Sequence, residues 1–184
     1  AAKLGKKNLK SLNTVAEKGI EIVFSSTSCG MTLKHEYESI LGLPGASELR
    51  DHLFEISQFL IRLNDEGRLN TNFKPIQETY YYHAPCHLRA LQIGLPALEL
   101  LSLIPGLKVI ELPDGCCGLA GTYGFKKEKF EIAREVGEEI FRAIREQKVK
   151  KVISDCEACR LQIGHQTGVE TFHPVQIILQ AYGD

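Results

Sequence analysis

The segment Thr79-Tyr80-Tyr81-Tyr82-His83-Ala84-Pro85-Cys86-His87 decides the fold of this chain. Its tyrosine run predicts a strand over 79–83, and a cysteine follows the strand closely. The same order recurs twice downstream. A strand predicted over 107–112 leads to the pair Cys116-Cys117, and one over 152–154 leads to Cys156-Glu157-Ala158-Cys159. Each of these three short strands therefore ends in a cysteine-bearing loop.

Helical periodicity fills the intervals between the strands. The segment 126–145 has one apolar face, made of Phe130, Ala133, Val136, Ile140 and Ile144. Further helices are predicted over 88–103 (with a break at 94–96), over 158–166 and from Pro174 onward, and a last strand over 169–172. Strands and helices that alternate in this way predict an α/β fold, with a parallel sheet flanked by helices on both faces.

The positions of the strands predict where the cysteines meet. In open α/β sheets, ligands bind outside the carboxyl ends of the strands, and parallel strands share that edge. Three loops at this edge are expected to bring together five thiols, those of Cys86, Cys116, Cys117, Cys156 and Cys159. Cys29 is the one cysteine that stands apart from them in the sequence.

The first 45 residues resemble the end of another copy of this unit. They predict a helix over 1–18, a strand over 20–24, a small polar loop that ends at Cys29, and a helix over 31–41. When this part is shifted by 130 residues, Cys29 coincides with Cys159, whereas Ser26 takes the position of Cys156. The segment 1–45 is therefore interpreted as the tail of a first, truncated repeat.

The segment 46–77 is predicted to be a helix and a linker between the two repeats. Ser47 is expected to cap one long helix that reaches Leu63, because five apolar residues form a single stripe: Leu49, Leu53, Ile56, Leu60 and Leu63. The polar stretch 64–75 indicates a linker. Residues 78–184 then form the second, complete cysteine-bearing domain.

The composition excludes several classes of protein. The 184 residues include 22 Lys and Arg against 23 Asp and Glu, a net charge of −1 that provides no basic field for nucleic acid. The most apolar stretch, 95–112, is interrupted by prolines and charged residues, so no transmembrane segment is expected. No secretion signal is recognisable, which predicts a reducing compartment where clustered cysteines bind metals or carry redox chemistry. The chain lacks an initiator Met, which suggests a piece of a longer protein.

Five clustered thiols favour a multinuclear metal site. Four thiolates satisfy either tetrahedral zinc or a [4Fe–4S] cluster, so a fifth thiol exceeds both. The adjacent side chains of Cys116 and Cys117 diverge, and two irons of one cluster suit them better than one metal atom. Zinc stays open as an alternative or substitute, and so does a dithiol redox role for Cys156 and Cys159 at the start of a helix.

Other residues near the thiols are weaker candidates. His83 and His87 flank Cys86 and are candidates for reserve zinc ligands or hydrogen-bond donors. Glycines recur at positions 115, 118, 121 and 124, where they allow backbone N–H groups to approach a sulfur atom. This glycine-rich run fits neither of the common phosphate-loop patterns.

These motifs resemble the cysteine-rich CCG-domain family. The spacing Cys86-x29-Cys116-Cys117-Gly118-x37-Cys156-x2-Cys159 carries the resemblance. The flanking runs 83–87, 116–128 and 154–159 narrow it to the C subunits of anaerobic glycerol-3-phosphate dehydrogenases, which are related to the B subunit of heterodisulfide reductase. The resemblance implies a [4Fe–4S] cluster, of the non-cubane type in related repeats, held by Cys86, Cys116, Cys117, Cys156 and Cys159. Cys29 would belong to the site of the first repeat.

The same resemblance implies a role in electron transfer. The chain would pass electrons from a flavin dehydrogenase subunit toward membrane quinone, without binding the oxidised substrate itself. It would be cytoplasmic, or peripheral at the inner face of the cell membrane. Two alternatives stay open: a zinc-binding structural or docking domain, and disulfide chemistry of the heterodisulfide reductase type.

Overall fold

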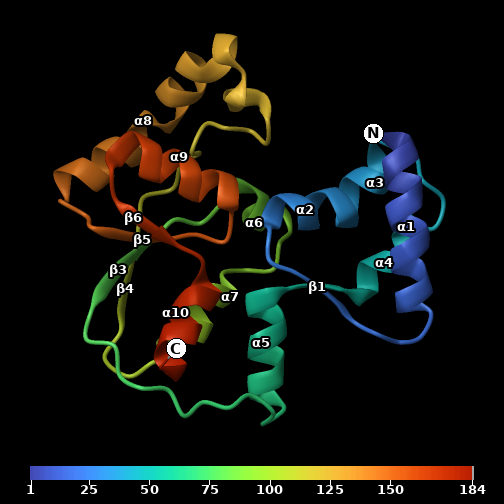
Figure 1. Ribbon diagram of the computed structural model, residues 1–184, viewed down its shortest axis with the longest axis horizontal. Coiled ribbons are helices and arrows are strands. Elements are labelled where there is room, and N and C mark those ends of the chain that lie inside the picture. Colours follow the sequence, from blue (N-terminus) through green and yellow to red (C-terminus); the bar gives the residue numbers. More distant parts are fainter. Residues whose placement is uncertain (184) are drawn as a thin grey trace.

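The computed structural model describes residues 1–183 as two αβ units that lie side by side (Figure 1). The larger unit is built on a four-stranded sheet with the order β4-β3-β5-β6. Its strands are β3 (Thr79–Tyr82), β4 (Lys108–Glu111), β5 (Lys151–Ile153) and β6 (Glu170–Phe172), and every pairing is parallel. The predicted α/β fold with a parallel sheet is confirmed.

Helices cover both faces of this sheet (Figure 1). They are α7 (Pro96–Ser102), α8 (Phe130–Glu146), α9 (Glu157–Thr167) and α10 (Pro174–Tyr182). The short α6 (Cys86–Ala90) follows β3 and lies toward the smaller unit. Tyr82 and Ile153 pack against α7 and α10, whereas Tyr81 and Val152 pack against α8 and α9. Successive strand residues thus face opposite layers, as the pleat of a strand requires.

The buried face of α8 differs in one position from the predicted stripe. Val136 is 53% exposed, and the buried face continues instead through Gly137 to Ile140 and Phe141. Glycine has no apolar side chain, so hydrophobic periodicity does not detect it. The pattern therefore places the neighbouring Val136 on the buried face in its stead. Gly137 is needed because a Cβ there would lie 2.8 Å from the carbonyl oxygen of Cys117.

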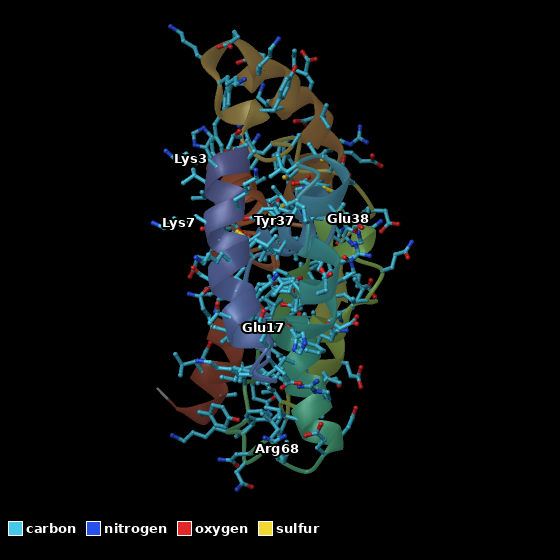
Figure 2. The ribbon with its side chains drawn as sticks, turned by 90° about the vertical axis from the view of Figure 1, so that its right-hand side faces the viewer. Lys3, Lys7, Glu17, Tyr37, Glu38 and Arg68 are labelled. Atoms are coloured by element: carbon cyan, nitrogen blue, oxygen red, sulfur yellow. The ribbon has the colours of Figure 1, made fainter. Side chains whose placement is uncertain are left out.

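The smaller unit contains α1 (Ala2–Ala16), β1 (Ile22–Phe24), α2 (Thr27–Met31), α3 (Tyr37–Ser39) and α4 (Ala46–Leu49), with a π-helical turn between α2 and α3. Figure 2 shows its outer side, with Lys3, Lys7 and Glu17 along α1 and Tyr37 between α1 and the helices behind it. The hydroxyl of the buried Tyr37 accepts a hydrogen bond from Asn8 Nδ2 at 3.2 Å, which joins α1 to α3.

The single helix expected from Ser47 to Leu63 is wrong. The chain forms α4, a 3₁₀ turn, then strand β2 (Leu53–Glu55), and only afterwards α5 (Ile56–Asp65). Strand β2 pairs in parallel with β1, with Leu53 opposite Ile22. The Glu55 carboxylate accepts hydrogen bonds from the backbone N–H groups of Ser57 and Gln58, and so starts a new helix. Leucines spaced by three and four residues fit two short helices around a strand as well as one long helix.

The two units match locally at the offset that the sequence suggests. Ser26 is the N-cap of α2 and Cys156 is the N-cap of α9, and each follows a short parallel strand. Cys29 and Cys159 then occupy the same turn of their helices. This local likeness supports the interpretation of 1–45 as part of a repeat, which stays a prediction. Within residues 1–183, no helix is both long and apolar enough to cross a membrane.

Glu55 is a buried carboxyl group and is 1% exposed. Burial raises its pKa to about 7, and the nearby carboxylate of Asp155 in the larger unit adds to the shift. The folded chain therefore keeps a proton on Glu55 that the unfolded chain loses near its ordinary pKa of 4.5. Because the folded state binds more protons between these two values, the free energy of unfolding falls as pH rises from about 4.5 to 7.

The variant Glu55→Gln removes this proton but keeps a side-chain oxygen that can accept the two helix-capping hydrogen bonds. The wild-type free energy of unfolding falls over this pH range and that of the variant does not. The difference between variant and wild type should therefore grow by up to about 3 kcal/mol from pH 5 to pH 8. Urea unfolding at both pH values, under reducing conditions, measures the difference. Glu17→Gln on exposed α1 (Figure 2) is the control and should keep the wild-type profile. An equal pH slope in wild type and Glu55→Gln would contradict the assignment.

Candidate functional site

Strand order places the cysteine loops around one point of the sheet. The chain leaves β3 toward α6 and α7 on one face, and leaves β5 toward α9 on the other face. Neighbouring parallel strands whose connections diverge in this way open a crevice at their carboxyl ends. Cys86 is the first residue of α6 after β3, Cys156 caps α9 after β5, and Cys116 and Cys117 lie in the loop after β4.

All five of these thiols line one small cavity, together with Ser28 and His87. Their burial is graded, since Cys117, Cys156 and Cys159 are buried, Cys116 is half-buried and Cys86 is exposed. The site therefore has a closed floor at β5 and α9 and an open rim at α6.

The thiols contact one another in a chain. The thiol of Cys159 donates to the sulfur of Cys117 at 3.2 Å. Cys156 is near enough to this pair to raise the pKa of Cys159 further. Cys116 lies on the side of Cys86, and the two thiols shift each other's pKa in opposite directions. The adjacent Cys116 and Cys117 thus have different further partners, as their sequence position predicts.

Charge is unevenly distributed over the five sulfurs. Hydrogen bonds from Cys117 and Cys86 hold the pKa of Cys116 far below its usual value, and a hydrogen bond from Cys159 lowers the pKa of Cys156 to about 6. The donors show the opposite shift. The hydrogen bond to Cys116 raises the pKa of Cys117 to about 11, and the pKa of Cys159 is raised by its bonds to Cys117 and Cys156. These shifts favour ionisation of Cys116 and Cys156 over ionisation of Cys117 and Cys159.

This donor set fits a thiolate-coordinated metal group. Neighbouring thiolates repel one another, which disfavours ionisation of all five thiols. A cation in the cavity would offset this repulsion and allow more of them to ionise. Among residues 1–183, no three His, Cys, Asp or Glu side chains are already arranged to hold a metal ion. The paired sulfurs must separate to admit one.

Glycines allow the Cys116–Cys117 loop to approach α8 closely. Gly118 has a φ of +87°, and a Cβ on it would lie 1.8 Å from the carbonyl oxygen of Ala133. Its backbone N–H donates a hydrogen bond to the sulfur of Cys116 at 3.3 Å. Of the glycines noted in the sequence, Gly118 therefore serves both the packing against α8 and a backbone hydrogen bond to sulfur.

The weaker candidates occupy different places. His83 is buried behind the site, and burial lowers its pKa to about 4, so it is neutral at physiological pH. His87 lines the thiol cavity. Cys29 lies apart from the five thiols, in a second cavity of about 500 Å³ that α1 and α2 line.

Ser28 is a residue that the sequence did not single out. Its hydroxyl lies 2.9 Å from Nδ1 of His87 and 3.8 Å from the sulfur of Cys156. A serine in a small polar loop gives no chemical signal. The only hint in the sequence is its position beside Cys29, in the loop that matches the one before Cys159.

A family model for the cysteine-rich CCG domain matches residues 80–164, the segment that contributes all five thiols. The chain carries a CCG domain. The five clustered cysteines thus all lie within the matched CCG segment, and the expected resemblance to this family is confirmed.

Three relatives extend beyond the CCG domain into the smaller unit. The C subunit of anaerobic glycerol-3-phosphate dehydrogenase from Escherichia coli is 38% identical over 175 residues, which cover 95% of this chain and 44% of the relative. An uncharacterized iron-sulfur protein of Methanocaldococcus jannaschii is 31% identical, with 89% and 30% covered. The D subunit of a heterodisulfide reductase from Methanosarcina barkeri is 29% identical, with 87% and 38% covered. The chain thus spans less than half of the length of these relatives.

The contact between Gly118 and α8 can be tested by adding one methyl group. Gly118→Ala is expected to destabilise the chain by at least about 3 kcal/mol, because a backbone carbonyl blocks the new Cβ. Gly121→Ala is the matched control: it also has a positive φ, of +64°, but no atom within 4 Å of the new Cβ. Gly121→Ala should therefore lose only about 1 kcal/mol of stability, the cost of placing an alanine at a positive φ. Urea denaturation compares the two, and equal losses would refute the close approach.

Proposed function

We propose that this chain is an iron–sulfur electron-transfer module of an oxidoreductase complex. The observation that supports this most directly is the convergence of five thiols, from three loops of the CCG domain, on one cavity at the carboxyl edge of the sheet. Thiolates are the ligands of iron–sulfur clusters, and an iron-sulfur protein is among the relatives. The proposed ligands are Cys86, Cys116, Cys117, Cys156 and Cys159.

The contacts of the thiols favour a multinuclear group over a single zinc ion. Zinc in a structural site takes four ligands from one tetrahedron. Here Cys117 accepts a hydrogen bond from Cys159 toward the buried floor, whereas Cys116 lies near Cys86, which is exposed at the rim. Ligands that diverge in this manner suit separate irons of one [4Fe–4S] cluster, including the non-cubane type. Zinc remains the alternative occupant, which metal and sulfide analysis distinguishes.

The protein would tune this group in two ways, through a backbone hydrogen bond and through graded burial. The cluster supplies reversible one-electron chemistry when bound. Gly118 N–H donates to the sulfur of Cys116 and stabilises negative charge there. The buried side of the site excludes water from Cys117, Cys156 and Cys159, while the exposed Cys86 marks the side from which electrons can enter and leave.

The likeness to the C subunit extends the proposal to partners. Electrons would arrive from a flavin-containing dehydrogenase subunit and leave toward membrane quinone, with this chain in the cytoplasm or at the inner face of the membrane. Substrate oxidation would then take place on the partner. The relative from Methanosarcina barkeri, named for heterodisulfide reduction, makes turnover of a disulfide the competing outcome.

The variant Cys117→Ser tests the proposed ligand set. The wild-type chain, purified without oxygen, should contain about four irons with matching acid-labile sulfide. Cys117→Ser should lose most of both, because a buried ligand at the centre of the thiol chain is removed. Cys29→Ser is the matched control and should keep the wild-type content, since Cys29 lies outside the thiol cavity. One zinc without sulfide in wild type would refute the electron-transfer proposal, and unchanged iron in Cys117→Ser would remove Cys117 from the ligand set.

A further inference from the structure

Ser28 approaches the thiol site from the smaller unit. It lies on α2, whereas the thiols belong to loops of the larger sheet. Its hydroxyl contacts two groups, Nδ1 of His87 at 2.9 Å and the sulfur of Cys156 at 3.8 Å. His87 in turn follows Cys86 on α6. The Ser28 hydroxyl therefore lies between His87, which is next to Cys86, and the proposed ligand Cys156.

The single proton of the Ser28 hydroxyl restricts the directions of these two hydrogen bonds. A serine hydroxyl has one proton to donate, and its oxygen can accept at the same time. A metal-bound Cys156 is a thiolate, so its sulfur can only accept. Ser28 must then donate to Cys156, and it must accept from His87, because its only proton is already used. His87 is consequently fixed in the tautomer that carries its proton on Nδ1.

Resting on the cluster proposed above, we propose that His87 Nδ1–H donates to Ser28 Oγ–H, which donates to the sulfur of Cys156, and that this relay raises the reduction potential of the site. Reduction places more negative charge on the ligand sulfurs, and a hydrogen bond to sulfur stabilises the reduced state more than the oxidised state. Ser28 and His87 are positioning residues in this scheme.

Contacts between the two units hold the relay in place. The ring of His173, which caps α10, hydrogen-bonds through Nε2 to the carbonyl oxygen of Ser25 at 3.0 Å. Ser26 caps α2 by accepting a hydrogen bond from the N–H of Cys29. The loop before Ser28 is thus anchored on both sides, so the smaller unit contributes a defined donor to the site. The same contacts link the position of this unit to the potential of the larger one.

The reduction potential of the loaded chain tests the relay. Ser28→Ala should shift the midpoint to a more negative value with iron and sulfide contents unchanged, because a donor to sulfur is lost while every ligand remains. Ser28→Thr keeps a hydroxyl and should restore the wild-type potential. Ser25→Ala removes an exposed hydroxyl from the loop just before α2 and is the matched control, with no expected shift.

A double-mutant cycle tests whether His87 acts through Ser28. His87→Ala alone should shift the potential in the same direction by a smaller amount, because Ser28 can still donate to Cys156 but is less polarised. In the Ser28→Ala background, His87→Ala should cause no further shift. Additive shifts would mean that His87 acts on the site directly, which would overturn the relay.

The outcomes separate this inference from the proposed function. Full iron and sulfide with an unchanged potential in Ser28→Ala overturns the relay and leaves the electron-transfer proposal standing. A wild-type chain that takes up no iron and sulfide overturns the electron-transfer proposal, and the relay that rests on it falls too. A negative shift in Ser28→Ala, with rescue by Ser28→Thr, supports both.

Discussion

The parallel pairing of β3 with both β4 and β5 is the constraint on which the site depends. Because β3 is central and its neighbours run in the same direction, the chain emerges from all three strands at one edge. The loops after them and the first turns of α6 and α9 carry the five thiols. Divergent connections on the two faces then open the crevice between β3 and β5 where those thiols meet. No single loop holds the site; the sheet holds it.

Packing of α8 against the Cys116–Cys117 loop completes the arrangement. The helix presents Ala133 and Gly137 at this contact, and the loop presents Gly118, so backbone meets backbone with no side chain between them. This close packing holds the Gly118 N–H group near the sulfur of Cys116. Gathering the thiols has a cost, since neighbouring sulfurs raise the pKa of Cys86, Cys117 and Cys159 and so disfavour their ionisation. A bound cationic group would remove that cost.

The smaller unit takes part in the site even though its own cysteine does not. Ser28 reaches the thiol cavity, His173 fastens the loop before it, and Glu55 is buried near Asp155 of the larger unit. The similarity to relatives of this chain extends beyond the CCG domain into the smaller unit. In the proposed function the larger unit would supply the ligands, and the smaller unit would add the Ser28 hydroxyl as a donor.

The sequence by itself determined the alternation of strands and helices, the parallel sheet and the group of five cysteines. These follow from local periodicity and from the rule that parallel strands share a carboxyl edge. It misassigned 47–63, because a leucine stripe has the same spacing in one helix as in short helices around β2, and only pairing with β1 decides between them. It also overlooked Gly137 and Ser28, whose roles come from contacts with residues distant in sequence. Strand order, the pairing among sulfurs and the reach of Ser28 across the units were decided by tertiary structure alone, because each depends on distances between segments that no local pattern encodes.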